Sequence, residues 1–353
     1  MRLFSSRLSS ELSSELSTFR SAQMMNTTMT PIQHEIFDAA ALLGQHPPVW
    51  NHATKLAVFD LVVSANGGFA GTIDYARWDQ ESIPPILTQR SNCTISEGIY
   101  TYAPPANDAD VHWHVNFADP HLFIAYGSAL MAQDEIQAAE HPALGSLLEA
   151  LVAAGLPTLT ATRDGRATPV TIAGVERHCS IDTLPRPEQG RPQGLYGNLF
   201  ARATKKQIKD AVDVLTPPTV SNIVAMAAPY PSSGRYTAAQ ISSVVSTAYT
   251  AFAAASRETT RLHGDSARTT IHSGHWGCGA FGGNRTLMTI LQLLSADLAN
   301  VDLRFWAFDE EGSRIASEAL LHYEELIARS ASVATLLQAL ESEGYLWGQS
   351  DGN

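Results

Sequence analysis

The strongest constraint on the fold of this chain is a glycine-rich turn followed at once by an amphipathic segment. The turn, at residues 275–283, reads His-Trp-Gly-Cys-Gly-Ala-Phe-Gly-Gly, and its glycines let the backbone bend sharply and approach a ligand closely. In the next segment, leucine and isoleucine recur at the spacing of one helix face, at Leu287, Ile290, Leu291, Leu294 and Leu298. The pattern predicts a half-buried helix whose amino end points at the turn, an arrangement that binds anions.

The turn also fits the spacing G-x-G-x-x-G, from Gly277 through Gly279 to Gly282, which is typical of dinucleotide-binding proteins. In a nicotinamide-binding fold, however, this turn follows the first strand and precedes several strand–helix units. Few residues follow Gly283 here, and most of them have a helical pattern. A nicotinamide-dependent oxidoreductase is therefore the less favoured interpretation.

The composition disfavours some classes of partner. The chain has 353 residues, 44% of them hydrophobic, so it can bury a sizeable core, and its formal charge of −12 disfavours tracking along a polyanion. Direct DNA binding is not expected. A membrane span is not expected either, because no apolar run approaches about 20 residues. An anionic ligand would have to be held locally, by backbone amides and a few arginines.

Cysteine usage and the N-terminal sequence bear on location. Three cysteines lie far apart in the sequence, which argues against a disulfide framework or a zinc site. We expect a reducing compartment, either the cytoplasm or the nucleus. The Ser-rich residues 1–28 are interpreted as a disordered leader. An organelle-targeting peptide is the alternative, although Glu11 and Glu15 are unusual in such peptides.

Two patterns follow the leader. Residues 30–44 have a capping Thr, a Pro at the first helical position and a terminal Gly, which predict a helix, and we interpret residues 29–90 as a helical accessory region. From about residue 91, β-rich runs alternate with amphipathic segments, which predicts an α/β sheet domain. Its expected strands cover residues 112–117, 170–173, 222–228 and 302–308. Its expected helices cover residues 128–140, 147–154, 205–214, 313–328 and 333–343, with another that begins after Thr237.

A second motif, at residues 115–136, carries the candidate chemistry. It runs from Val-Asn-Phe-Ala-Asp, which contains Asn116 and Asp119, to a polar group made of Gln133, Asp134 and Glu135. A partly buried carboxyl group next to another acid should have a raised pKa, which suits proton donation near neutral pH. The alternative is that the polar group is an ordinary solvated patch on a helix.

The two motifs together resemble the poly(ADP-ribose) glycohydrolase family. That family has a nearly identical Trp-Gly-Cys-Gly-Ala-Phe loop and a segment that runs, without a gap, from Val-Asp-Phe-Ala-Asn through Gly-Gly-Gly to Gln-Glu-Glu. Three further stretches resemble family strands in the same order, at residues 172–176, 222–226 and 305–308. The resemblance extends approximately over residues 90–345.

The resemblance implies a macrodomain-like α/β fold, with a three-layer mixed sheet flanked by helices and an N-terminal helical extension. The implied parts are the leader at 1–28, the accessory region at 29–90, the catalytic domain at 91–345 and a tail at 346–353. The implied activity is hydrolysis of the ribosyl O-glycosidic bond of poly(ADP-ribose) or protein-linked ADP-ribose, which releases ADP-ribose without a metal or other cofactor. The implied partners are ADP-ribose or ADP-ribosylated proteins. The alternative is a catalytically weak or inactive module that binds ADP-ribose.

The resemblance also implies roles for single residues. Glu135 matches the family's catalytic glutamate, an acid that then acts as a base, while Asp134 and Gln133 would orient the ribose. Further ribose-side contacts are expected from Asn116 and Asp119. The diphosphate is expected at Gly127, Ser128, Gly277, Cys278, Gly279, Ala280 and Phe281. The adenine is expected at Trp306 or Phe308, with Glu97 near its amine.

The chain departs from the family pattern at two places that matter for the substrate. Phe123-Ile124-Ala125 stands where the family has three glycines, so bulky side chains are expected where the backbone should close on the diphosphate and ribose. A Gly-Ser turn at residues 127–128, expected to precede a helix, could still offer amides to an anion. Thr183-Leu184 replaces a pair whose Tyr covers the adenine in the family. A mono-ADP-ribosyl substrate therefore stays open beside the polymer.

Two other interpretations are less favoured. Cys278, close to the amino end of a helix, could be a thiol nucleophile. His112 with His114, or His272 with His275, could ligate a metal, but no third ligand lies nearby in the sequence. We expect these histidines to be ordinary core or surface residues.

Overall fold

The computed structural model describes residues 30–350 and 352, so the leader expected at 1–28 lies outside the described residues. Residues Ile32–Asn353 form one compact unit, which includes the region expected to be an accessory part. None of the helices in the described part combines the length and apolar character that a membrane crossing requires.

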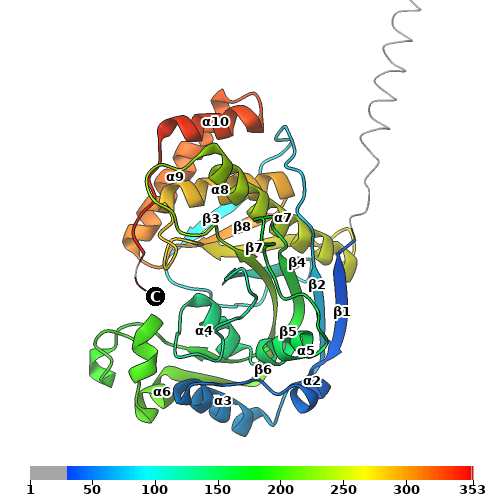
Figure 1. The fold of residues 1–353 in the computed structure, drawn as a ribbon, viewed down its shortest axis with the longest axis vertical. Helices are drawn as coiled ribbons and strands as arrows, with labels where there is room; N and C mark the ends of the chain where they lie inside the picture. The colour runs from blue at the N-terminus through cyan, green and yellow to red at the C-terminus, as the bar shows by residue number, and fades with distance from the viewer. Residues whose placement is uncertain (1–29, 351, 353) are drawn as a thin grey trace, which may run out of the picture. The chain divides into compact units, whose positions relative to one another are not determined.

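One eight-stranded sheet organises this unit, in the order β1-β2-β5-β6-β4-β7-β8-β3 (Figure 1). The strands are β1 (Gln33–Asp38), β2 (Thr72–Arg77), β3 (Cys93–Ser96), β4 (Asp110–Ala118), β5 (Val170–Ile181), β6 (Val212–Ala227), β7 (Arg268–Gly274) and β8 (Asp302–Trp306). From β6 to β3 all neighbouring strands are parallel, whereas β1, β2, β5 and β6 pair antiparallel. The sheet is therefore mixed, as expected.

Helices cover both faces of the sheet. One face is packed against α7 (Ala238–His263), α8 (Arg285–Ala299), α9 (Glu310–Arg329) and α10 (Val333–Glu343). The other side carries α2 (Ala39–Gln45), α3 (Ala53–Asn66), α4 (Gln133–Glu140), α5 (Ala143–Ala153) and α6 (Lys205–Ala211). Because successive strand residues point to opposite faces, Trp113, Ile271 and Phe305 join the α7–α8 core, while Ile223 and Ala225 join the core on the α5 side. The expected three-layer α/β architecture is confirmed.

The prediction of a helix at residues 30–44 is wrong for its first half. Residues Gln33–Asp38 form β1, which pairs antiparallel with β2, and a helix begins only at Ala39. Asp38 caps that helix, because its side chain accepts a hydrogen bond from the amide of Ala41 (2.8 Å). β2 in turn pairs with β5, so the region expected to be a helical accessory part contributes two strands to the sheet.

Three other boundaries differ from the expectation. The helix expected at 128–140 begins at Gln133, because residues 121–128 form a series of tight turns instead. The helix expected at 205–214 ends at Ala211, because Val212 already pairs with Ile181 of β5. The strand expected at 302–308 ends at Trp306. The expected strands at 112–117, 170–173 and 222–228 are confirmed in position, and so are the helices at 147–154, after Thr237, at 313–328 and at 333–343, although some extend beyond the expected ends.

Candidate active site

The predicted site residues gather at one edge of the sheet. β4, β6, β7, β8 and β3 are parallel, so their carboxyl ends lie at the same edge, which is where open α/β sheets bind ligands. Two connections there carry most of the candidates. We call residues 119–132, between β4 and α4, the acid loop, and residues 275–283, between β7 and α8, the glycine loop. Since β4 and β7 are neighbours, the two loops start from adjacent strands.

The sheet opens between β4 and β7 just before these loops. Their pairing ends at His114 and His272, while β4 continues to Ala118 against β6 alone. Gln133, the first residue of α4, fills the vacated edge: its Oε1 accepts from the amide of Phe117 (2.8 Å) and its Nε2 donates to the carbonyl of Val115 (3.1 Å). Both ends of this amide are thus bonded to β4. Gln133 fixes the start of α4 to the sheet, and the expectation that it orients a ribose is not supported by its contacts.

The two acids follow Gln133 in the first turn of α4 and point inward. Asp134 is 7% exposed and Glu135 is 4% exposed, so the alternative of a solvated patch is wrong. Asn116 Nδ2 of β4 donates to Asp134 Oδ1 (3.0 Å), and the amide of Ala132 donates to Glu135 Oε2 (3.0 Å). Asn116 Oδ1 is buried and has no hydrogen-bond partner in the part of the chain that the structure describes. The fully buried Asn116 thus keeps one acceptor beside the acids.

Burial raises the pKa of both carboxyl groups, as the sequence predicted. For Asp134, loss of solvent is the main cause, the neighbouring charge of Glu135 adds to it, and the pKa rises to about 8. For Glu135, loss of solvent again raises the pKa, against the opposing charge of Lys55. Asp119 raises both values slightly further. Near neutral pH the pair therefore retains a proton that it can donate.

Lys55 is a component of the site that the sequence analysis missed. It comes from α3, only 1% of it is exposed, and its Nζ donates to the carbonyl of Tyr126 in the acid loop (2.9 Å). Burial lowers its pKa to about 8, against the attraction of Glu135 and Asp134. The one signal in the sequence is its scarcity, because the chain has three other lysines and all lie between residues 205 and 209.

The acid loop is bonded to the segment that precedes α3. The carbonyl of Gly127 accepts from the amides of Asn51 (2.9 Å) and His52 (3.1 Å), and a Cβ on Gly127 would lie 2.2 Å from the carbonyl oxygen of Val49. Ser128 donates its amide to Ala125 (2.9 Å), and α4 starts only at residue 133. Of the two amides that the Gly-Ser turn was expected to offer to a diphosphate, that of Ser128 is therefore bonded within the protein, whereas that of Gly127 has no acceptor among the described residues.

The Phe-Ile-Ala stretch does not place its bulky side chains as expected. Phe123 has a left-handed backbone (φ +52°), which is unusual for a bulky residue, and its ring is fully buried in the core on the α5 side. Ile124 is 63% exposed. Asp119, half exposed, accepts from the amide of His121 (2.9 Å). Phe123 thus adopts a conformation that favours glycine, and its side chain turns inward.

The glycine loop is closed by its own backbone. Three backbone amides donate to backbone carbonyls within the loop: Cys278 to His275 (3.0 Å), Gly282 to Gly279 (3.0 Å) and Gly283 to Gly277 (2.9 Å). Gly277 needs to be glycine on two counts, since its φ is +72° and a Cβ would lie 2.7 Å from Cβ of Ala228. These hydrogen bonds and the close packing at Gly277 therefore hold the loop in its turned shape.

Three successive amides of this loop stay free. The amides of Gly279, Ala280 and Phe281 have no acceptor among the described residues, although all three residues are half-buried. Directly after the loop, Asn284 caps α8, and the exposed guanidinium of Arg285 lies close enough to Cys278 to lower its pKa. Free amides, a helix amino end and a cation are groups that attract anions. Arg285 was not singled out from the sequence.

Cys278 does not have the chemistry of a nucleophile. Burial raises the pKa of its thiol to about 12, despite Arg285. The histidines are not arranged as metal ligands either, since the described residues contain no group of three or more suited to hold a metal ion. His114 and His272 are buried and lie against one another, with 4.4 Å between ring centroids. Burial lowers the pKa of both, so they are neutral core histidines.

The two adenine candidates occupy different environments. Trp306, at the end of β8, donates a hydrogen bond from its indole Nε1 to His272 Nδ1 of β7 (3.1 Å), which fixes the ring against the sheet. Phe308 lies beyond the strand, has a left-handed backbone (φ +67°), and is 52% exposed. It exchanges two backbone hydrogen bonds with Gly98 (3.1 and 3.0 Å), which brings the exposed Glu97 next to it. Phe308 is thus the ring with a free face.

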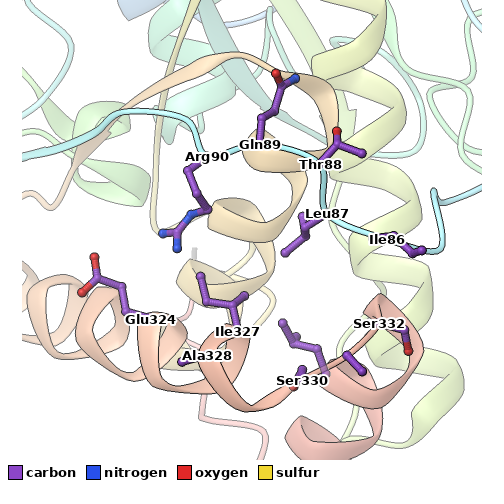
Figure 2. Close-up of a pocket in the computed structure, with 12 residues that line it drawn as sticks. Ile86, Leu87, Thr88, Gln89, Arg90, Glu324, Ile327, Ala328, Ser330 and Ser332 are labelled. Atoms are coloured by element: carbon purple, nitrogen blue, oxygen red, sulfur yellow. The ribbon is translucent and has the colours of Figure 1, made fainter.

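A separate hollow of about 470 Å³ contains none of the predicted residues. It lies between residues 86–90 and the α9–α10 corner, as Figure 2 shows, and its lining includes Ile86, Leu87 and Ile327. Arg90 at its rim is paired with Asp297 (2.8 Å). This hollow is on the face of the sheet opposite the acids.

Comparison with known proteins gives the following similarities. Residues 192–314 match the family model of the poly(ADP-ribose) glycohydrolase catalytic domain, described as having a macro domain fold. No curated protein sequence matches the chain. The structure is similar to poly(ADP-ribose) glycohydrolase from Thermomonospora curvata, with 15% identity, a TM-score of 0.42, and 74% of this chain and 88% of that one covered. It is also similar to a variant of the Deinococcus radiodurans enzyme in complex with ADP-ribose, with 14% identity, a TM-score of 0.39, and 83% and 94% covered.

The family match spans the glycine loop, α8 and β8, which are the elements on which the sequence resemblance first rested. Residues 192–314 of this chain are therefore similar to the poly(ADP-ribose) glycohydrolase catalytic domain, which is described as having a macro domain fold.

Proposed function

We propose that this protein hydrolyses the ribosyl O-glycosidic bond of poly(ADP-ribose) or of protein-linked ADP-ribose and releases ADP-ribose. One observation carries the proposal: a buried acid pair that retains a proton lies at the end of β4, and three free amides lie at the end of the adjacent strand β7. A ribose attached to a diphosphate would present its glycosidic bond to the first group and its phosphates to the second.

In this mechanism Glu135 acts twice. As an acid it protonates the oxygen that leaves the ribose, while positive charge develops on the sugar. As a carboxylate it then takes a proton from a water molecule, whose oxygen bonds to the anomeric carbon. The buried Asn116 Oδ1 beside Asp134 would accept a hydrogen bond from a ribose hydroxyl. Each turnover consumes one water and returns the proton to Glu135.

The diphosphate would be held mainly by backbone. The amides of Gly279, Ala280 and Phe281 donate no hydrogen bond to the described residues, and Arg285 adds a cation next to them. Local amides suit a protein whose formal charge is −12, because the rest of its surface repels a polyanion. Phe308 would lie against the adenine, as a ring with an exposed face and with Glu97 near it.

A second candidate is an ADP-ribose-binding module without turnover. It is favoured by the acid loop, where Ser128 donates its amide to Ala125 and the carbonyl of Gly127 is bonded to the α3 segment, so this loop has less freedom to close on a ligand. Both candidates use the same residues, and they differ only in whether the acids act on the bond.

Incubation with poly(ADP-ribose) and with mono-ADP-ribosylated protein separates the two candidates. We expect release of free ADP-ribose, and a loss of about 10²–10⁴-fold in kcat for Glu135→Gln, which keeps the shape but removes the acid. ADP-ribose binding, measured by calorimetry, should persist in this variant. The matched control is Glu318→Gln on the exposed face of α9.

The possible outcomes point in different directions. Binding without release in both wild type and Glu135→Gln supports the binding module. No binding of ADP-ribose by either protein contradicts both candidates. Nicotinamide reduction would revive the oxidoreductase interpretation of the glycine-rich turn.

A further inference from the structure

Lys55 differs from every other lysine of the chain in its surroundings. The other three, at positions 205, 206 and 209, are exposed on α6, whereas Lys55 is 1% exposed. An isolated ammonium is costly to bury unless its environment compensates for the lost water. The groups around Lys55 therefore decide how far its charge persists.

The direct contact of Lys55 is with the acid loop. Its Nζ donates to the carbonyl of Tyr126 (2.9 Å), in a loop whose Gly127 is also bonded to Asn51 and His52. Among the described carboxylates, none comes within ion-pair distance of Nζ. The ammonium is thus held by a neutral carbonyl while its charge stays available to the site as a whole.

The charged neighbours of the acid pair are few. Asp134 and Glu135 act on one another, Asp119 of the acid loop adds a negative charge, and Lys55 is the cation that opposes them. Asn116 contributes a neutral hydrogen bond to Asp134. Without a cation, two adjacent buried carboxyl groups would both stay protonated near neutral pH, because burial and mutual repulsion act in the same direction. Neither could then act as a base.

We propose that Lys55 is a positioning residue of the hydrolysis, whose ammonium keeps one charge and one proton on the Asp134–Glu135 pair while its hydrogen bond fixes the acid loop beside them. This inference rests on the proposed function for its catalytic consequence. It also assigns a role to α3, which lies outside the stretch where the family resemblance was found.

The test compares Lys55→Met, which removes the charge, Lys55→Gln, which keeps a hydrogen-bond donor, and Lys55→Arg, which keeps the charge. We expect the acidic and the basic limb of the pH profile of kcat/KM to move to higher pH by about one unit in the Met and Gln variants, because the acid pair loses its opposing charge. In the Arg variant both limbs should stay near their wild-type positions. Lys209→Met, at an exposed position, is the matched control. A purely structural role of Lys55 would lower the rate at every pH and leave the limbs in place.

A second measurement does not depend on turnover. Carboxyl ¹³C NMR titration of wild type and Lys55→Gln, assigned with Asp134→Asn, reports the acid pair directly. Carboxyl titration at the same pH in both folded proteins overturns the inference, even if the wild type is active. If the wild type releases no ADP-ribose but the titration moves upward in the variant, the proposed function fails and the electrostatic role of Lys55 stands. If Lys55→Met does not fold, the comparison of wild type with Lys55→Gln tests the inference.

Discussion

The glycine loop and the acid loop start from adjacent strands, yet they differ in how their backbone groups are used. In the glycine loop, the left-handed positions are Gly277 and Gly282, and three amides remain free. In the acid loop, Phe123 holds a left-handed position, and the carbonyls of Gly127 and Tyr126 are bonded to α3 and the segment before it. One loop is shaped for a ligand by its own sequence. The other depends on a distant part of the chain for its shape.

This difference indicates a division of labour. A loop that must donate amides to an anion cannot use those amides for packing, so its shape has to come from glycine conformations. A loop that leads into a helix with buried acids has to be held rigidly, because the pKa values of the acids depend on their surroundings. Four substitutions probe this comparison.

The largest loss of stability is expected for Gly127→Ala. The new Cβ would lie 2.2 Å from the carbonyl oxygen of Val49, so the acid loop has to move away from residues 49–52. We expect the free energy of unfolding to fall by about 3 kcal/mol in urea melts, with a loss of activity. Gly44→Ala is the control, because nothing lies within 4 Å of its Cβ position. Equal stability of the two variants would show that the acid loop does not need its close contact with residues 49–52.

The second prediction concerns pH. Asp134 binds its proton more tightly in the folded protein, where its pKa is about 8, than in the unfolded chain, where it is near 3.8. The native state therefore loses stability as pH rises between these values. Asp134→Asn removes this loss, so its stability relative to wild type should rise with pH by up to about 1.4 kcal/mol per pH unit.

Urea melts of the two proteins between about pH 5 and about pH 8 measure this difference. Asp60→Asn, an exposed position on α3, is the control for loss of a charge. Parallel stability curves for wild type and Asp134→Asn would mean that the folded protein does not hold Asp134 in its protonated form.

The third substitution is on the ligand side of the comparison. Phe308→Ala should weaken ADP-ribose binding by about 1–3 kcal/mol, the usual contribution of a base stacked on an aromatic ring, as measured by calorimetry. Stability should change little, because the ring is already 52% exposed. Leu321→Ala, at an exposed position on α9, controls for the loss of an exposed apolar side chain. Unchanged affinity would remove Phe308 from the site.

The smallest effect tests the strain at Phe123. Both Phe123→Gly and Phe123→Ala lose a buried ring, but only glycine relieves the left-handed backbone. We expect the Gly variant to be more stable than the Ala variant by about 1 kcal/mol, the reverse of the usual order. At the buried Phe200, which has no left-handed backbone, the usual order should hold. The same order at both positions would contradict the comparison of the two loops.

Much of the site was predictable because it depends on local patterns. The glycine loop, the apolar stripe of α8 and the acids at the start of α4 each lie within one short stretch of sequence, and the structure puts them at one edge of the sheet. The raised pKa of Glu135 was also predictable, since adjacent acids at a buried helix start have few other outcomes.

The parts that were missed depend on contacts between distant residues. Residues 33–38 have the capping signals of a helix, but pairing with residues 72–77 makes them a strand. Gln133 belongs to the family signature, yet its role follows from the gap between β4 and β7, which no sequence pattern marks. Lys55 lies 80 positions before Glu135 and on another helix, so only the folded chain brings its charge to the acids.

The sequence by itself determined which chemical groups are present and which local shapes hold them, because glycine turns, helix stripes and adjacent acids act over a few residues. The tertiary structure decided which of these groups lie close together, which are buried away from water and which already have hydrogen-bond partners. Burial and long-range charge set the behaviour of Lys55, Asp134 and Glu135, and both arise only when α3, α4 and β4 pack together.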